Sequence, residues 1–266
     1  MADVSLELDG KGQYLGRIKD TATLGVYNDG IYNDGVYNFP LNLRIANAWT
    51  LGFWTKPGAN KEHATIFSVG DKDGKNEIRV SSTSIPVETP ILGKRPAELR
   101  VLIKDFDGTT IKQYGWGDWF QTEVWTHTFL QWNGTELIAY KNAILTTTGV
   151  VLVNVSGTMA DFPPRKIFYG STVAGNFATY SGIMGHFGMW DEVLDLAELE
   201  TVVSGGFASD LTVTSGSYTS QANLQHYWKP GDDNTNLGKD FTTSGTPLDL
   251  DRQRNLTTGN IISDAP

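Results

Sequence analysis

One short stretch of the sequence combines aromatic rings with polar side chains, as a sugar-binding site requires. It reads GWGDWFQ from 115 to 121, and its candidate ligand-binding residues are Trp116, Asp118, Trp119, Phe120 and Gln121. An exposed ring offers a flat apolar face to a sugar, while carboxylate and amide groups bind the hydroxyls. We expect a loop between strands here and treat it as a candidate glycan site. The alternative, that the rings close the edge of the core, is open.

A second stretch spaces oxygen atoms as a calcium-binding loop does. In DKDGKNE, from 71 to 77, the candidate ligands are Asp71, Asp73, Asn76 and Glu77. Ca²⁺ binds carboxylate and amide oxygens at such spacings. Asp-Gly is also a strong hairpin signal, and the two intervening lysines reduce the local negative charge. The turn is therefore the favoured interpretation, and calcium is the one cofactor that the sequence suggests.

A five-residue pattern of Val or Ile followed by Tyr-Asn-Asp-Gly occupies residues 26–38. Three copies are too few for a solenoid, and the Asn-Asp-Gly triplets each favour a turn. We expect a surface insertion that displays Tyr27, Tyr32 and Tyr37 as candidate partner contacts. Packing of the insertion onto its own domain is an equal alternative.

The groups that most enzymes use are missing or scattered. There is no cysteine, which removes thiol nucleophiles, thiolate metal sites and disulfides together. The four histidines lack the spacing of a transition-metal site, and we expect His127 and His186 to lie in the core. The sequence also has no P-loop and no Gly-x-Ser-x-Gly motif. We therefore predict that the protein is not an enzyme.

Charge and hydropathy restrict the partners. The net charge of −9 repels a phosphate backbone and no basic run occurs, so nucleic acid is not expected as a partner. The first ten residues lack the charge and apolar stretch of a secretory signal, and no apolar run approaches the ~18 residues of a membrane span. We expect no signal peptide, no membrane insertion and synthesis in the cytoplasm.

Short alternating segments between turns predict an all-β protein, a two-sheet antiparallel sandwich. Residues 48–57 form the strongest strand, expected at the centre of a sheet. Residues 4–8 and 13–18 flank a turn signal and are expected to pair as an opening hairpin. One short helix is expected after Asp195, which forms a capping box with Glu198, and it should end at Gly205.

The last 36 residues differ from the rest of the chain. From 231 to 266 the sequence is polar and rich in turns, with only a few spaced leucines and one phenylalanine as apolar anchors. Such a segment cannot form a core of its own. We expect one folded domain over 1–230, with the insertion at 26–38, and a tail over 231–266 that packs on the sandwich or on a neighbouring subunit.

The order of several motifs resembles the laminin-G-like branch of the concanavalin A-like lectin and glucanase superfamily. The most specific match is TLGFWTKP from 50 to 57, followed by Trp-x-His at 125–127 and by GIMGHFGMWDEVLDLAELE from 182 to 200. This resemblance implies a concanavalin A-like jelly roll. The glycosidases of this superfamily carry a Glu-x-Asp-x-x-Glu pattern, which this sequence lacks, so the resemblance favours binding over hydrolysis.

A narrower similarity concerns the ends of the chain. The HYWKPGDD segment from 226 to 233 and the terminal ISDAP are similar to structural proteins of tailed bacteriophages. The resemblance implies a virion surface protein, either capsid-associated or part of a tail or fibre, whose partners are other virion proteins, copies of itself and cell-surface glycans. The alternative is a carbohydrate-binding lectin module with the calcium site described above.

Overall fold

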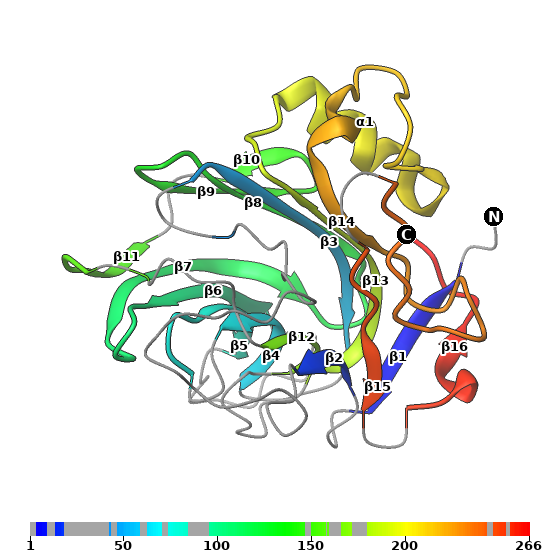
Figure 1. The fold of residues 1–266 in the computed structure, drawn as a ribbon, viewed down its shortest axis with the longest axis horizontal. Helices are drawn as coiled ribbons and strands as arrows, with labels where there is room; N and C mark the ends of the chain where they lie inside the picture. The colour runs from blue at the N-terminus through cyan, green and yellow to red at the C-terminus, as the bar shows by residue number, and fades with distance from the viewer. Residues whose placement is uncertain are drawn as a thin grey trace, which may run out of the picture.

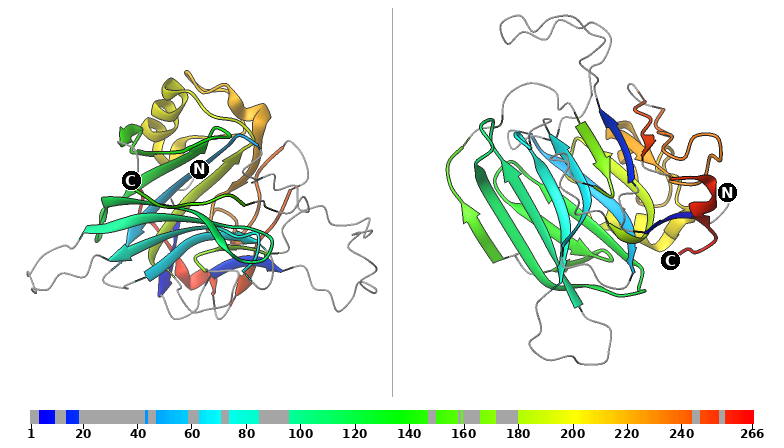
Figure 2. Two further views of the ribbon diagram at one scale, coloured as in Figure 1. Left: turned by 90° about the vertical axis from the view of Figure 1, so that its left-hand side faces the viewer. Right: turned by 90° about the horizontal axis from the view of Figure 1, so that it is seen from below.

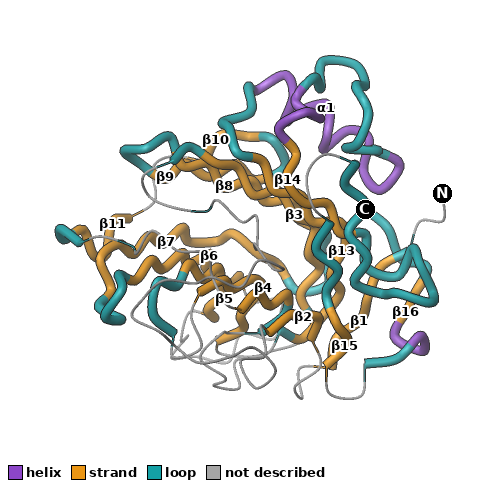
Figure 3. The backbone as a smooth tube through the Cα atoms, viewed as in Figure 1, coloured by secondary structure: helices purple, strands orange, loops and turns teal. Residues whose placement is uncertain are grey.

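A computed structural model describes residues 4–9, 14–18, 43, 47–58, 63–70, 74–84, 96–146, 150–157, 159, 166–171, 180–243, 247–253 and 256–266. These residues form two stacked antiparallel sheets and one α-helix (Figures 1 and 3). The predicted all-β class, a two-sheet antiparallel sandwich with one short helix, is confirmed. No helix among the described residues is long and apolar enough to cross a membrane.

Sheet A contains eight strands in the described part of the chain, with the order β10-β9-β8-β3-β13-β1-β16 and β14 also paired with β13. The long apolar segment expected at the centre of a sheet is β3, which lies between β8 and β13. The strands are β1 (Ser5–Asp9), β3 (Trp49–Pro57), β8 (Thr126–Trp132), β9 (Leu137–Lys141), β10 (Ile144–Thr146), β13 (Ser181–Trp190), β14 (Leu224–Trp228) and β16 (Ile261–Ile262).

Sheet B also contains eight strands, in the order β11-β7-β6-β5-β4-β12-β2-β15, and Figure 2 shows the two layers from two further sides. The strands are β2 (Tyr14–Ile18), β4 (His63–Gly70), β5 (Ile78–Ser84), β6 (Pro96–Lys104), β7 (Thr110–Gln121), β11 (Val150–Asn154), β12 (Lys166–Tyr169) and β15 (Asp251–Gln253).

The main core lies between the inner faces of the two sheets. Phe187 of β13 stacks on Phe53 of β3, with ring centroids 5.8 Å apart. It also stacks on Phe67 of β4 in the opposite sheet, at 4.8 Å. All three side chains are buried, and full burial of each contributes about 1.5–3 kcal/mol. The apolar side chains on the inner faces of these strands therefore hold the two layers together.

Helix α1 (Leu196–Gly205) lies over the outer face of sheet A (Figure 1). A second apolar cluster lies between the helix and the sheet. Phe129 and Trp190 of the sheet pack with Leu199 of the helix. Gly52 makes room for this layer, because a Cβ atom there would lie 2.6 Å from the ring of Phe129. The predicted capping box is confirmed: Asp195 accepts from the Glu198 amide, and Glu198 accepts from the Asp195 amide. Three short 3₁₀ turns follow, at Gly206–Ala208, Ser220–Asn223 and Thr258–Asn260.

The predicted opening hairpin is wrong. β1 pairs with β13 and β16 in sheet A, whereas β2 pairs with β12 and β15 in sheet B. The chain therefore crosses from one sheet to the other between these strands. Both strands alternate apolar and polar residues, and this alternation is the same whichever sheet a strand joins.

The described part of the tail lies on the chain's own sandwich rather than extending away from it. β15 pairs with β2 at one edge of sheet B, and β16 pairs with β1 at one edge of sheet A. Leu237, Leu250 and Leu256 are buried. Figure 1 shows the orange and red C-terminal segments beside β1 and β14. The tail thus closes one edge of each sheet.

Candidate functional site

The aromatic stretch predicted as an exposed glycan site is buried, so this expectation is wrong for its three rings. Trp116, Trp119 and Phe120 belong to β7 rather than to a loop and are exposed by 3%, 0% and 1%. The indole Nε1 of Trp119 donates to Oγ1 of Thr128 at 2.8 Å. Bulges in the pairing of β6 with β7 shift the register, so Trp116 lies opposite the core residue Leu99. The alternative, that these rings close the core, describes the structure.

The polar members of that stretch are exposed but separated from any ring face. Asp118 has a left-handed backbone with φ of 52°, and its carbonyl accepts from Nζ of Lys141 at 3.0 Å. Gln121 is exposed at the end of β7. A polar group without a neighbouring exposed ring lacks the stacking half of the predicted site.

Half of the predicted calcium loop is described. Asp71 and Asp73 lie outside the described residues, as do Tyr27, Tyr32 and Tyr37. Asn76 and Glu77 are buried, and Glu77 is held inside the protein: Oε1 accepts from Oγ of Ser68 at 3.0 Å, and Oε2 lies 3.1 Å from Nζ of Lys104. The described residues contain no group of three or more His, Asp or Glu side chains placed to bind a metal ion. Calcium therefore stays a prediction.

A cluster of cations lies on the outer face of sheet B. The register of β5 with β6 places Arg79 opposite Leu102 and Ser81 opposite Arg100. The neighbouring residues Val80 and Val101 are core residues, so the side chains of Arg79 and Arg100 point to the outer face. The two arginines are diagonal neighbours in the antiparallel pair, at Cα separations of ~7–8 Å. Lys104 is the other diagonal neighbour of Arg79.

We call this region the basic face and define it by Arg79, Ser81, Glu98, Arg100, Lys104 and Gln113. The side chains of Arg79, Arg100 and Lys104 are exposed by 28%, 36% and 20%. Glu77 pairs with both Arg79 and Lys104, at 3.9 Å and 3.1 Å, but its side chain is fully buried. Three cations therefore stand against two carboxylates, a local excess of positive charge in a chain whose net charge is −9.

Glu98 orients Arg100 along the sheet. Nε of Arg100 donates to Oε2 of Glu98 at 2.8 Å. The Glu98 side chain lies across Gly115 of β7, where a Cβ atom would approach Oε1 to 2.3 Å. Because glycine leaves that space empty, the carboxylate lies flat and holds the guanidinium by one edge. The other edge of the guanidinium makes no hydrogen bond to the described residues, so it can bind a ligand.

Aromatic platforms are scarce elsewhere on the described surface. Of the aromatic residues whose side chains are described, Phe106 alone is exposed, at 56%. It lies in the turn after β6, where the Asp105 carboxylate accepts from three backbone amides. The described surface is therefore better suited to binding charged groups than to stacking against neutral sugar rings.

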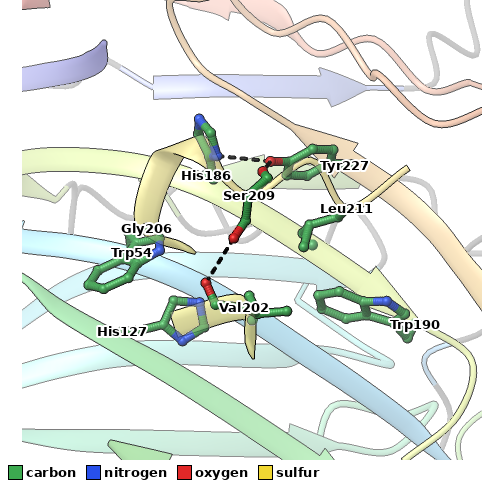
Figure 4. Close-up of a pocket in the computed structure, with 11 residues that line it drawn as sticks. Trp54, His127, His186, Trp190, Val202, Gly206, Ser209, Leu211 and Tyr227 are labelled. Carbon is green, nitrogen blue, oxygen red and sulfur yellow. Dashed lines mark hydrogen bonds between the residues drawn. The ribbon is translucent and has the colours of Figure 1, made fainter. Parts of the chain in front are cut away.

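A small pocket lies between sheet A and α1, and Figure 4 shows its lining. Trp54, His127 and His186 line it from the sheet, and Tyr227 closes it. The Tyr227 hydroxyl lies 2.9 Å from Nδ1 of His186 and donates to the Ser209 carbonyl at 2.9 Å. The free volume is about 10 Å³, which is near the room that one water needs. The pocket is thus part of the packing under the helix.

Both histidines in this pocket are buried, as predicted, and burial lowers the pKa of each. Burial lowers the pKa of His127 to about 3, and the neighbouring His186 adds to this effect. Burial also lowers the pKa of His186 to about 3, with a further contribution from Lys229 and an opposing one from Asp210. Neutral imidazoles therefore belong to the folded state.

Two other buried carboxylates are structural. Burial would raise the pKa of Glu198, but hydrogen bonds from Thr219, Ser220 and the Asp195 amide outweigh it and lower that pKa. Burial acts in the same way on Asp240, where His226 and the amides of Tyr227 and Leu248 hold the pKa down. Nδ1 of His226 lies 2.6 Å from Oδ2 of Asp240, with both side chains fully buried. Both carboxylates are thus satisfied by hydrogen bonds within the protein.

No protein-family model matches the sequence, and no curated protein matches it. In structure the chain is similar to a putative carbohydrate-binding protein from Bacteroides ovatus, with a TM-score of 0.54 and 14% identity over 95% of this chain and 60% of that one. It is also similar to the CBM40 of the Ruminococcus gnavus IT-sialidase, with a TM-score of 0.50 and 12% identity over 75% of this chain and 96% of that one. At such identities the likeness shows the fold alone: the jelly-roll sandwich of lectin-like, carbohydrate-binding domains.

Proposed function

We propose that this protein is a non-enzymatic module that binds acidic glycans on the outer face of sheet B. The observation that carries the proposal is the placement of Arg79 and Arg100 as diagonal neighbours on that face, with Lys104 beside Arg79. A guanidinium binds a carboxylate or sulfate through two parallel N–H groups, which gives both strength and orientation. Acidic sugars carry such groups.

The rest of the basic face suits the hydroxyls of a sugar. Ser81 lies directly opposite Arg100 on β5, and Gln113 lies opposite Leu102 on β7. Hydroxyl and amide groups both donate and accept hydrogen bonds, as sugar hydroxyls do. Rigid strands support all of these side chains, so little order has to be gained on binding. The scarcity of exposed aromatic rings favours an acidic ligand over a neutral one.

The comparisons support this proposal at the level of the fold. The two structures described above are a putative carbohydrate-binding protein and the CBM40 of a sialidase. A jelly roll serves many functions, so the site itself must carry the assignment. Non-enzymatic binding is supported by the structural roles of the buried carboxylates Glu77, Glu198 and Asp240.

The experiment is a glycan array that includes sialylated, uronic-acid-containing, sulfated and neutral glycans. We expect binding to one or more acidic glycans, and we expect Arg100→Gln to weaken it roughly tenfold or more, because a hydrogen bond to a charged group contributes ~1.5–3 kcal/mol. The matched control is Lys239→Gln, which removes a cation of the tail that pairs with Asp233 and is not part of the basic face. Binding restricted to neutral glycans, or equal effects of the two substitutions, would contradict the proposal.

A structural role on the surface of a tailed-phage virion is a second candidate function, proposed from the sequence resemblance at the ends of the chain. The observation that favours assembly is an uncharged pair of edge strands, β10 and β11. Glycan binding and a virion role are compatible, because a surface protein can do both. Antibody labelling of purified particles tests this role: label on a capsid or tail supports it, and unlabelled particles contradict it.

A further inference from the structure

One long segment of this acidic chain carries no charge. Residues 142–160 contain no Asp, Glu, Lys or Arg, although 19% of the whole sequence is charged. The segment includes β10 and β11 and is rich in valine, isoleucine, leucine and threonine. Valine, isoleucine and threonine favour β-strands, and valine, isoleucine and leucine are usually buried.

The segment lies at an open edge of both sheets. β10 is the terminal strand of sheet A, and β11 is the terminal strand of sheet B. Only three residues, 147–149, join the two strands, so their adjoining ends lie within ~15 Å of each other. The apolar side chains are exposed by 44–71%: Ile144, Leu145, Val150, Val151, Leu152 and Val155.

An exposed, uncharged terminal strand can pair with a strand of another chain. The outer backbone amides and carbonyls of a terminal strand have no partner within their own sheet, and proteins usually protect such edges with lysine, proline or a covering loop. β10 and β11 contain no lysine and no proline. The opposite edges of the two sheets end in β15, which carries Asp251 and Arg252, and in β16, which has only two residues. Charge and short length protect those edges, so among the described strands the uncharged edge is the least protected.

We propose that a second copy of this chain covers this edge by antiparallel pairing of β11 with β11 of its partner about a two-fold axis. At such an axis the central residue of β11 meets its own symmetry mate, and its neighbours meet the residues on the other side of the centre, so a charge at the centre would face an identical charge. The absence of charge over 142–160 meets this requirement. Leu152 is the middle residue of β11 and lies where the register of β11 with β7 shifts. In the proposed pair it meets its own counterpart at the axis.

The exposed apolar area is of the size that a stable pair requires. Six side chains exposed by about half or more amount to several hundred Å², comparable with the ~800 Å² that each partner buries in an interface of standard size. A net charge of −9 on each copy opposes association through most other surfaces. The proposed pairing surface therefore differs from the rest of the molecular surface in both hydropathy and charge.

The pairing has a consequence for binding that rests on the proposed function. A two-fold axis perpendicular to the sheet keeps the outer faces of both copies of sheet B on the same side. The two basic faces would then lie on one continuous surface and could engage two acidic groups together, which raises the avidity for multivalent glycans. The pairing itself does not depend on glycan binding.

The first test uses the absence of cysteine, since any engineered cysteine is unique in the chain. Directly opposed residues of antiparallel strands have Cα separations of ~4.5–5.5 Å, which fit a disulfide. We expect Leu152→Cys to form disulfide-linked dimers under mild oxidation much faster than Val213→Cys, an equally exposed position outside sheets A and B. Equal rates for the two variants would overturn the proposal.

The second test is analytical ultracentrifugation of the intact chain over a range of concentrations. We expect a monomer–dimer equilibrium that Leu152→Lys abolishes and Val213→Lys leaves unchanged, because only the first places two like charges at the axis. A wild-type chain that stays monomeric at every concentration, or a dimer that Leu152→Lys leaves intact, would overturn the proposal. If circular dichroism shows that Leu152→Lys does not fold, the comparison of Leu152→Cys with Val213→Cys is the deciding test. Cδ1 of Leu152 lies 3.5 Å from the Cβ position of Gly115, beside Glu98 of the basic face. Glycan binding is therefore measured on the wild-type chain at concentrations where it is monomeric, so the two proposals can fail independently.

Discussion

Arg100 shows how one side chain acquires a role from its neighbours. Its position on β6 faces it outward, Glu98 holds one edge of the guanidinium, and Gly115 leaves the space that Glu98 occupies. Replacement of Gly115 by alanine would push the Glu98 carboxylate off the sheet. We expect Gly115→Ala to reduce acidic-glycan binding without greatly changing the free energy of unfolding, which titration calorimetry and urea denaturation together can measure.

The control for this prediction is Gly117→Ala, because nothing lies within 4 Å of a Cβ atom at that position. Both glycines are on β7, and both substitutions add the same methyl group. Equal losses of binding in the two variants would show that the orientation of Glu98 is not the cause.

The buried histidines predict a specific pH dependence. The pKa of His186 is about 3 in the folded protein and ~6.5 in the unfolded chain, which therefore binds more protons between these values. The stabilisation is complete above pH ~6.5 and is lost as the pH falls towards ~3, by up to several kcal/mol. We expect the free energy of unfolding of His186→Asn to decrease less steeply as the pH falls. Asparagine keeps a hydrogen-bond donor for the Tyr227 hydroxyl. A slope unchanged from wild type in urea titrations would contradict this account.

Asp240 connects the tail to strand β14 of sheet A. Its carboxylate accepts from the amides of Tyr227 and Leu248 and pairs with His226. Removal of one partner of a buried pair costs about 3–5 kcal/mol. We expect Asp240→Ala to lower the free energy of unfolding by about this amount in urea, whereas Asp191→Asn, at an exposed carboxylate, should cost less than about 0.5 kcal/mol. Comparable losses in the two variants would contradict the assignment.

The sequence predicted the elements better than their partners. The run of aromatic and apolar residues in 48–57 and the capping box at Asp195 are local signals, and both correspond to observed elements. The opening hairpin failed because the choice of sheet depends on contacts far along the chain. Trp116 and Trp119 were assigned to a loop because the nearby Gly115 and Gly117 suggested one, yet β7 contains all four residues.

The basic face could not have been found from the sequence, for a related reason. Arg79 and Arg100 are 21 positions apart, and neither belongs to a basic run. Only the register of β5 with β6 makes them diagonal neighbours. The uncharged segment 142–160 was visible in the sequence, but its exposure on two terminal strands was not.

For the whole molecule, the C-terminal segment is predicted to be part of the fold rather than an appendage. It supplies β15 to sheet B and β16 to sheet A, and Asp264 accepts from Nζ of Lys56 at 2.6 Å and from Nε1 of Trp125 at 2.9 Å. We expect deletion of residues 251–266 to lower the melting temperature by on the order of 10 °C. It should also cause aggregation detectable by light scattering, because two sheet edges are uncovered. An unchanged melting temperature would contradict this view of the tail.

A binding site for acidic glycans on the outer face of sheet B is tested by a two-dimensional NMR titration of the isotopically labelled protein with the acidic glycan that binds best on the array. The proposal predicts that the backbone amides of β5, β6 and β7 and the side-chain Nε–H signals of Arg79 and Arg100 shift together and saturate with one dissociation constant. Shifts confined to other parts of the chain, or no shifts with any acidic glycan, would contradict a binding site on the outer face of sheet B.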